Sequence, residues 1–154
     1  MRSFNMALGR LASFGPLITR IIIGALFFWH GIDKFRTGLS NVEGFFASSG
    51  VPLAGFTAPL TAVLEIALGA ALILGLFTRL SALILSGVMV GAIIWVKGTT
   101  VLGGNELDLV YLAGLLSLVL VGPGALSADE VLDQDMTVID LRSSPDRTRA
   151  SVSL

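Results

Sequence analysis

The sequence predicts an all-α integral membrane protein: a four-helix bundle with short interfacial helices and a flexible C-terminal tail. Of its 154 residues, 54% are hydrophobic and only 14% are charged, whereas soluble domains carry about 25% charged residues. Four apolar stretches, each close to the ~20 residues that cross a bilayer, alternate with connections rich in Gly and Pro. The predicted spans cover residues of about 16–36, 58–75, 79–96 and 106–121, within a membrane domain of residues 15–126.

The composition also excludes several classes of site. A net charge of −1 offers no basic surface for nucleic acid. The chain has no Cys and a single His, His30, which argues against disulfides, Cys-ligated cofactors and a multi-histidine metal centre. We therefore expect no metal site and no intrinsic cofactor. The lipid bilayer is the first expected partner.

The first span follows residues 1–14, an amphipathic lead-in that carries Arg2 and Arg10. Pro16 suits the first turn of a helix, and Gly38 is expected to end it. The pattern Ser-Asn-Val-Glu at 40–43 matches a capping box, which satisfies free N–H groups at a helix start. It predicts a short interfacial helix that stops at Gly50.

Proline and glycine positions define the middle spans. Because proline is tolerated in the first turn of a helix, the second span is expected to start at 57–59 and to end at Gly75. Thr78 is expected to cap the third span. Within that span Gly87 and Gly91 form a GxxxG pair, which lets another helix, including that of a second copy, approach closely.

The C-terminal part changes character after the fourth span. Asn105 is expected to cap that span, and Gly122, Pro123 and Gly124 to end it. The pattern Ser-Ala-Asp-Glu at 127–130 matches a second capping box and predicts a short helix. Residues 127–154 otherwise read as a polar cytoplasmic tail.

Lys and Arg placement predicts the orientation in the membrane. Counts flanking the spans are nearly even, and Arg20 together with the tail arginines tips them toward both termini inside. We therefore expect a multi-pass protein of the cell (inner) membrane with both termini cytoplasmic. In this topology His30, Lys34, Glu65 and Glu106 all lie toward the outer half of the bilayer.

Glu65 is the carboxylate deepest inside a predicted span. A charge there costs several kcal/mol unless it is paired, neutralised or hydrated. Glu65 either contacts a proton or ligand, or it forms a structural pair with Lys34 or Arg20, or it is a protonated acid bonded inside the bundle. His30 is equally explained as an interhelical donor, Lys34 as a residue that reaches the interface, and Glu106 as a charge that complements a helix N-terminus.

The ordered set of these motifs resembles the DoxX family of small membrane proteins. The matching positions span about 17–132 and comprise Gly24, Phe28, Gly31, Lys34, Phe35, Glu65, Gly69, the segment 74–79, Glu106, Tyr111 and the segment 122–129. The resemblance implies a four-helix membrane protein linked to quinone-coupled sulfur oxidation or to membrane oxidoreductase complexes. It marks Lys34, Glu65, Arg79 and Glu106 as motif positions with reactive side chains.

Three functions are consistent with these features. The first is a membrane subunit of an oxidoreductase-linked assembly, not catalytic alone, that contacts quinone; its catalytic candidates are Glu65, His30 and Lys34, and its cofactor-binding candidates are Glu65, Lys34, Glu106 and Arg79. The second is a non-catalytic structural or assembly subunit of a larger membrane complex. The third is a dimeric proton-coupled exporter, although such exporters carry their essential Glu in the first helix, where this chain has only Asp33.

Overall fold

The computed structural model describes residues 14–97 and 106–129. The regular elements in these ranges are all helical. They are α2 (Phe14–Thr37), α3 (Leu39–Ser48), α4 (Ala54–Leu74), α5 (Thr78–Gly91), the π-helical η1 (Ala92–Lys97) and α6 (Glu106–Val121). The predictions for the lead-in, for Asn105 and for the tail beyond 129 lie outside the described residues.

Three of these helices are long and apolar enough to cross a membrane: Phe14–Thr37, Ala54–Leu74 and Thr78–Val96. The predicted all-α membrane fold is therefore confirmed. The 16 residues of α6 rise about 24 Å at 1.5 Å per residue, less than the ~30 Å of a hydrocarbon core. The fourth span thus remains a prediction.

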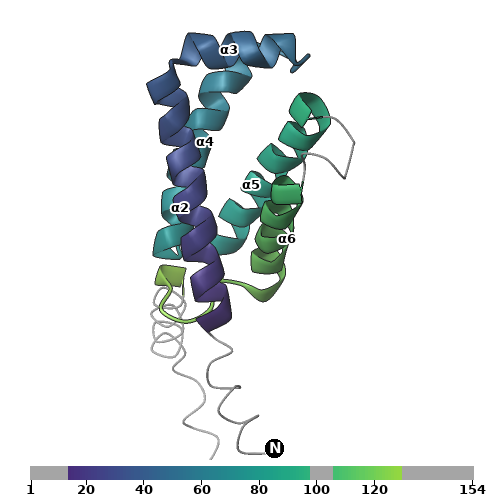
Figure 1. Cartoon of the computed structure of the whole chain (residues 1–154). Helices are drawn as coiled ribbons and strands as arrows, with labels where there is room; N and C mark the ends of the chain where they lie inside the picture. The colour runs from purple at the N-terminus through teal and green to yellow at the C-terminus, as the bar shows by residue number, and fades with distance from the viewer. Residues whose placement is uncertain (1–13, 98–105, 130–154) are drawn as a thin grey trace, which may run out of the picture.

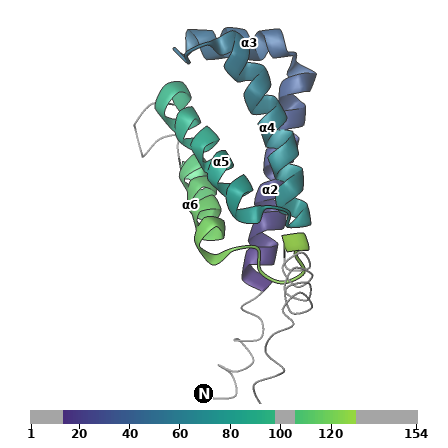
Figure 2. The same cartoon turned by 180° about the vertical axis from the view of Figure 1, so that it is seen from behind.

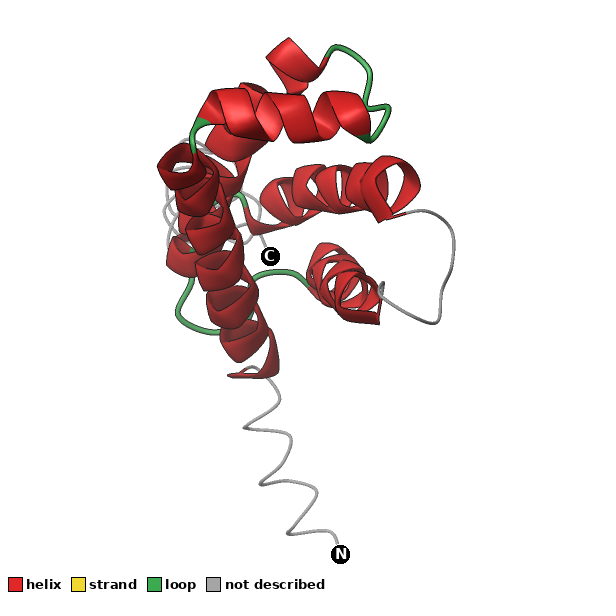
Figure 3. Ribbon diagram, turned by 45° about the horizontal axis from the view of Figure 1, so that its top comes forward, coloured by secondary structure: helices red, strands yellow, loops and turns green. Residues whose placement is uncertain are grey.

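The long helices form two pairs, α2 with α4 and α5 with α6 (Figure 1). The pairs meet where α4 turns into α5, and they diverge toward α3, as the opposite view also shows (Figure 2). Helix α3 lies crosswise over the end of the α2–α4 pair, the arrangement expected of an interfacial helix (Figure 1). Figure 3, with the α3 end turned forward, shows that α5 and α6 run in a different direction from α2.

Glycines allow α2 and α4 to touch through their backbones. A Cβ atom added at Gly24 would lie 2.7 Å from the carbonyl oxygen of Gly69, and one added at Gly69 would lie 2.7 Å from the backbone nitrogen of Phe28. One added at Gly31 would lie 2.8 Å from the carbonyl oxygen of Ala62. No side chain fits at these positions, so the crossing of α2 and α4 is fixed by glycine.

The predicted GxxxG pair, Gly87 and Gly91, does not form a helix contact of this kind. A Cβ atom added at Gly87 or at Gly91 meets no heavy atom within 4 Å in the described structure. No described helix of this chain packs against the pair. Contact with a second copy of the chain through these glycines remains a prediction.

A buried apolar cluster joins the two pairs near the end where they meet. It takes side chains from all four long helices: Ile23, Phe27, Leu72, Ala82, Leu85, Met89, Leu115 and Leu118. The ring of Phe27 also meets Tyr111 of α6 edge to face, with centroids 6.0 Å apart. The pairs can therefore diverge at the α3 end without separating.

Two predicted helix starts were wrong. At α3 the residue before the helix is Gly38, with φ of 94°, and no side chain caps the helix, so Ser40 does not act as the capping residue. Helix α4 begins at Ala54, earlier than the predicted 57–59, and contains Pro59. Left-handed Leu53 accepts the N–H groups of Phe56 and Thr57, which starts the helix one turn before the proline.

The predicted Thr78 cap was also wrong. Phe77 precedes α5 with φ of 45°, and no side chain within the helix start caps it. Instead the Asp129 carboxylate accepts the N–H groups of Phe77 at 2.6 Å and of Thr78 at 2.9 Å. The Asp129 N–H in turn donates to the carbonyl oxygen of Gly75 at 3.0 Å. The cap of α5 thus comes from the segment after α6.

Arg20 fixes the same segment from the other side. Its side chain is only 1% exposed, and its guanidinium donates to the carbonyl oxygens of Ala125, at 3.3 Å, and of Leu126. It fills the space beside Gly75, where a Cβ atom would collide with it. Gly75 ends α4 in the left-handed conformation, as predicted. Arg20 therefore binds backbone carbonyls and is not the partner of Glu65.

We predict that Asp129→Ala lowers the stability of the bundle by about 1 kcal/mol, because it removes the acceptor for two N–H groups at the start of α5. Thermal unfolding in mild detergent measures the loss. Asp129→Asn keeps one acceptor oxygen and should lose less. A variant Asp129→Ala that unfolds like the wild type would show that this contact does not hold the segment.

Candidate functional site

A cavity of about 910 Å³ lies between the two helix pairs, on the side of α3. Its wall includes residues of α2, α3, α4, α5, η1 and α6 and is mostly apolar. This volume falls in the range of small-molecule sites, which are commonly apolar with a few placed polar groups. The polar groups on this wall are therefore the ones to examine.

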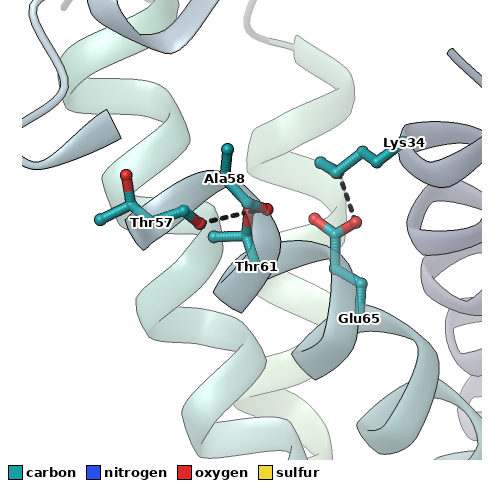
Figure 4. Close-up of polar contacts among 5 residues, drawn as sticks. All are labelled: Lys34, Thr57, Ala58, Thr61 and Glu65. Atoms are coloured by element: carbon teal, nitrogen blue, oxygen red, sulfur yellow. Dashed lines mark hydrogen bonds and ion pairs between the residues drawn. The ribbon is translucent and has the colours of Figure 1, made fainter. Parts of the chain in front are cut away.

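The central polar contact joins Lys34 of α2 to Glu65 of α4. The Lys34 ammonium Nζ donates to Oε2 of Glu65 (Figure 4). The Glu65 side chain is 7% exposed and that of Lys34 is 20% exposed, and both line the cavity. Of the two cations considered from the sequence, Lys34 is the partner of Glu65.

The α4 wall around Glu65 carries two threonines whose hydroxyls donate to backbone carbonyl oxygens. Thr57 donates to Leu53, just before the helix, at 3.2 Å. Thr61 donates to the carbonyl oxygens of Thr57, at 2.8 Å, and Ala58, at 3.0 Å (Figure 4). Thr57 and Thr61 both line the cavity. With these hydroxyl protons donated to backbone carbonyls, Lys34 supplies the charge-assisted hydrogen bond to the carboxylate.

The other sequence-predicted residues divide into two groups. His30 lies one turn before Lys34 and lines the same cavity. Glu106 is exposed at the start of α6 and is not part of the cavity wall. Arg79 is exposed at the opposite end of the bundle, where its Nε lies 3.3 Å from the point that a Cβ of Gly122 would occupy. The structure brings together His30, Lys34 and Glu65, without Arg79 and Glu106.

Two residues of α6 that carry polar groups also reach the cavity, although the sequence had not placed them in the site. Asp108 is buried and Tyr111 is partly buried, and both line the cavity. Their three-residue spacing puts them on one helix face, a signal that could have grouped them.

The π-helical segment η1 also contributes to the wall, through Ala92, Trp95 and Val96. Such segments are rare and often occur at functional sites, because the wider turn shifts the side chains that follow it. Here the segment continues α5 and presents the indole of Trp95 to the cavity.

A second, smaller pocket of about 260 Å³ lies beside α3. Its polar lining residues are Asp33, Lys34, Thr37 and Asn41, and Phe45 and Phe46 border both this pocket and the cavity. Lys34 therefore borders both the cavity and a small pocket at the interfacial helix whose wall includes Asp33, Thr37 and Asn41. A group at this position can exchange protons or hydrogen bonds with either side.

The DoxX family model matches residues 15–98, more than half of the chain. The chain belongs to the DoxX family. This DoxX protein is 36% identical over 116 residues to "Putative oxidoreductase CatD" of Bacillus subtilis, covering 75% of this chain and 84% of that protein. It is 35% identical over 137 residues to "Uncharacterized membrane protein Rv3486" of Mycobacterium tuberculosis, covering 80% of this chain and 84% of that protein.

A third relative of the DoxX protein is "Inner membrane protein YqjF" of Escherichia coli, 33% identical over 129 residues, with coverage of 81% of this chain and 97% of that protein. No solved structure matches the chain. The relatives and the apolar helices place the DoxX protein in the inner membrane as a multi-pass protein. The segment matched by the family model contains both Lys34 and Glu65.

We predict that Lys34 and Glu65 are energetically coupled. Lys34→Met leaves a buried carboxylate unpaired and should destabilise this DoxX protein by up to about 3–5 kcal/mol. Glu65→Gln should cost less, because the Lys34 ammonium is more exposed. The double variant should recover part of the loss, with a coupling of about 0.5–3 kcal/mol in detergent unfolding. Strictly additive losses would contradict the pair.

Proposed function

We propose that this protein is a membrane subunit of an oxidoreductase-linked assembly and that its cavity contacts a membrane quinone. The observation that carries the proposal is an apolar cavity between membrane-spanning helices with an ion pair, Lys34–Glu65, on its wall. A quinone has an apolar body and two carbonyl oxygens that accept hydrogen bonds. The name of the Bacillus subtilis relative, which includes the word oxidoreductase, agrees with this proposal.

In this proposal Lys34 donates a hydrogen bond to one quinone carbonyl, and Glu65 holds the ammonium in place. Reduction of a quinone to the quinol takes two electrons and two protons. The electrons come from a partner protein. Lys34 and His30 deliver the two protons, and the Glu65 carboxylate passes a proton to Lys34 to restore its ammonium. The flat indole of Trp95 and the ring of Tyr111 on the facing wall suit contact with a quinone ring.

We further propose that both termini lie in the cytoplasm, so that α3 and the Asp33 pocket face outward. A Cys introduced at Ser48, which is exposed at the end of α3, should react with an impermeant maleimide in intact cells. A Cys introduced at Ser151 should react only after the cells are lysed. The opposite pattern would invert the topology and place the polar pocket on the cytoplasmic side.

Quinone contact is testable through the two tryptophans of the chain. Trp95 lines the cavity, whereas Trp29 is exposed on α2, with the Arg36 guanidinium 5.7 Å from its ring centre. In a Trp29→Phe variant, a quinone that enters the cavity should quench Trp95 fluorescence in a saturable way. In the matched Trp95→Phe variant, the remaining Trp29 should show only weak quenching that rises linearly with quinone in the bilayer.

Equal, non-saturable quenching of both tryptophans would contradict the proposed site. The second candidate, a structural or assembly subunit, would then be favoured. It is supported by the direct pairing of Lys34 with Glu65, which leaves each charge a partner within the chain. A structural subunit predicts loss of stability on substitution of the pair, without any saturable quinone signal.

A further inference from the structure

The cavity is open to the surface of the molecule, and its exposed lining residues include side chains on α4 and on the continuation of α5. Several lining residues are strongly exposed even though they belong to the wall. Phe56 on α4 is 64% exposed, and Trp95 on η1 is 47% exposed. Leu53 and Leu60 on the α4 side and Gly87 on the α5 side are also exposed. Leu26 on α2 and Leu107 on α6 are exposed lining residues as well. The opening between α4 and α5 is therefore one open side of a cavity that is also exposed at α2 and α6.

This opening faces the hydrocarbon of the bilayer. Both of its edges, Ala54–Leu74 and Thr78–Val96, belong to helices that are long and apolar enough to span. The tight turn at 75–77 joins the two helices at one end, and they diverge toward α3 in both views (Figures 1 and 2). Since exposed apolar side chains on a spanning helix contact lipid chains, the gap opens sideways into the membrane.

Gly87 and Gly91 keep the α5 wall of this opening free. They lie four residues apart, on one face of the helix, and both line the cavity. The missing side chains of Gly24 and Gly69 are replaced by the backbone of the facing helix, whereas a Cβ atom added at Gly87 or Gly91 would meet no described atom of another helix within 4 Å. The two α5 glycines therefore preserve space and do not close a helix contact within the chain.

We propose that the quinone enters sideways from the bilayer, between α4 and α5, and that its apolar chain lies along Gly87 and Gly91. This inference rests on the proposed function and names the ligand class: a quinone with a long flexible chain. The ion pair Lys34–Glu65 comes from the α2 and α4 walls. A ring that reaches the pair leaves its chain beside the α5 glycines and in contact with lipid.

The experiment substitutes these glycines in the full-length Trp29→Phe protein, reconstituted in phosphatidylcholine nanodiscs and titrated with decylubiquinone. Gly87→Leu and Gly91→Leu fill the space beside these two glycines, which we call the trough. Gly44→Leu on α3 is the matched control, because a side chain there also meets open space but is not part of the cavity wall. The trough variants should weaken saturable Trp95 quenching by about tenfold or more, and the control should stay within about twofold. All three should unfold near the temperature of the parent.

The outcomes separate this inference from the function on which it rests. Saturable quenching in the parent with no loss in Gly87→Leu or Gly91→Leu overturns the chain path and leaves the quinone contact in place. No saturable quenching in the parent removes the quinone itself. In that case strong quenching of Trp95 by dibrominated phosphatidylcholine, lost in Gly87→Leu, would assign the trough to a lipid chain. If native mass spectrometry shows a dimer that Gly91→Leu loses, while quenching of Trp95 by the brominated lipid is unchanged, the trough is assigned to contact with a second copy of the chain.

Discussion

The backbone contact between α2 and α4 is the constraint on which the rest of the molecule depends. Gly24 and Gly31 bring α2 against Gly69 and Ala62 of α4 so closely that no Cβ atom fits between them. In a helix the side chains lean toward the N-terminus, so Lys34 leans back toward the level of Gly31. That level is also where Glu65 projects from α4, between Ala62 and Ile66. The ion pair is thus a consequence of the glycine crossing.

The second helix pair is held differently, and this difference makes the cavity. The apolar cluster around Leu72 and Leu85 joins the pairs where α4 turns into α5, and Asp129 and Arg20 secure the segment after α6 at the same end. Toward α3 the pairs diverge (Figure 1). Because the bundle is held together at one end, a cavity forms at the other end, and Lys34 and Glu65 line it.

The position of the Lys34–Glu65 pair on the cavity wall explains how the protein tolerates these charges, because the pair is not fully enclosed in apolar surroundings. A salt bridge fully enclosed in apolar surroundings loses more hydration than its attraction returns. The Lys34 side chain stays 20% exposed and also borders the small pocket near Asp33 and Asn41, while Glu65 lines the cavity. The pair therefore lies on the cavity wall and, through Lys34, also borders the interfacial end of the protein.

The sequence by itself determined which segments are helical and where α4 and α6 end, because hydrophobic length and local breakers act over a few residues. It did not determine where α3 and α4 start. The predicted end of α4 at Gly75 and the end of α6 at Gly122 rest on glycines that adopt positive φ. It also identified Glu65 as the charge that needs an explanation, since the cost of burying a carboxylate follows from its position in an apolar span. Lys34 was one of two partners it offered.

Only the tertiary structure decided which residues meet. It chose Lys34 over Arg20 as the partner of Glu65, and it replaced the local Thr78 cap by Asp129, which is about fifty residues away. It also showed which glycines pack within the chain: Gly24 and Gly69 close a helix contact, while Gly87 and Gly91 meet no other helix of the described structure. Local patterns report periodicity and propensity, but which faces pack together depends on contacts between helices far apart in the chain.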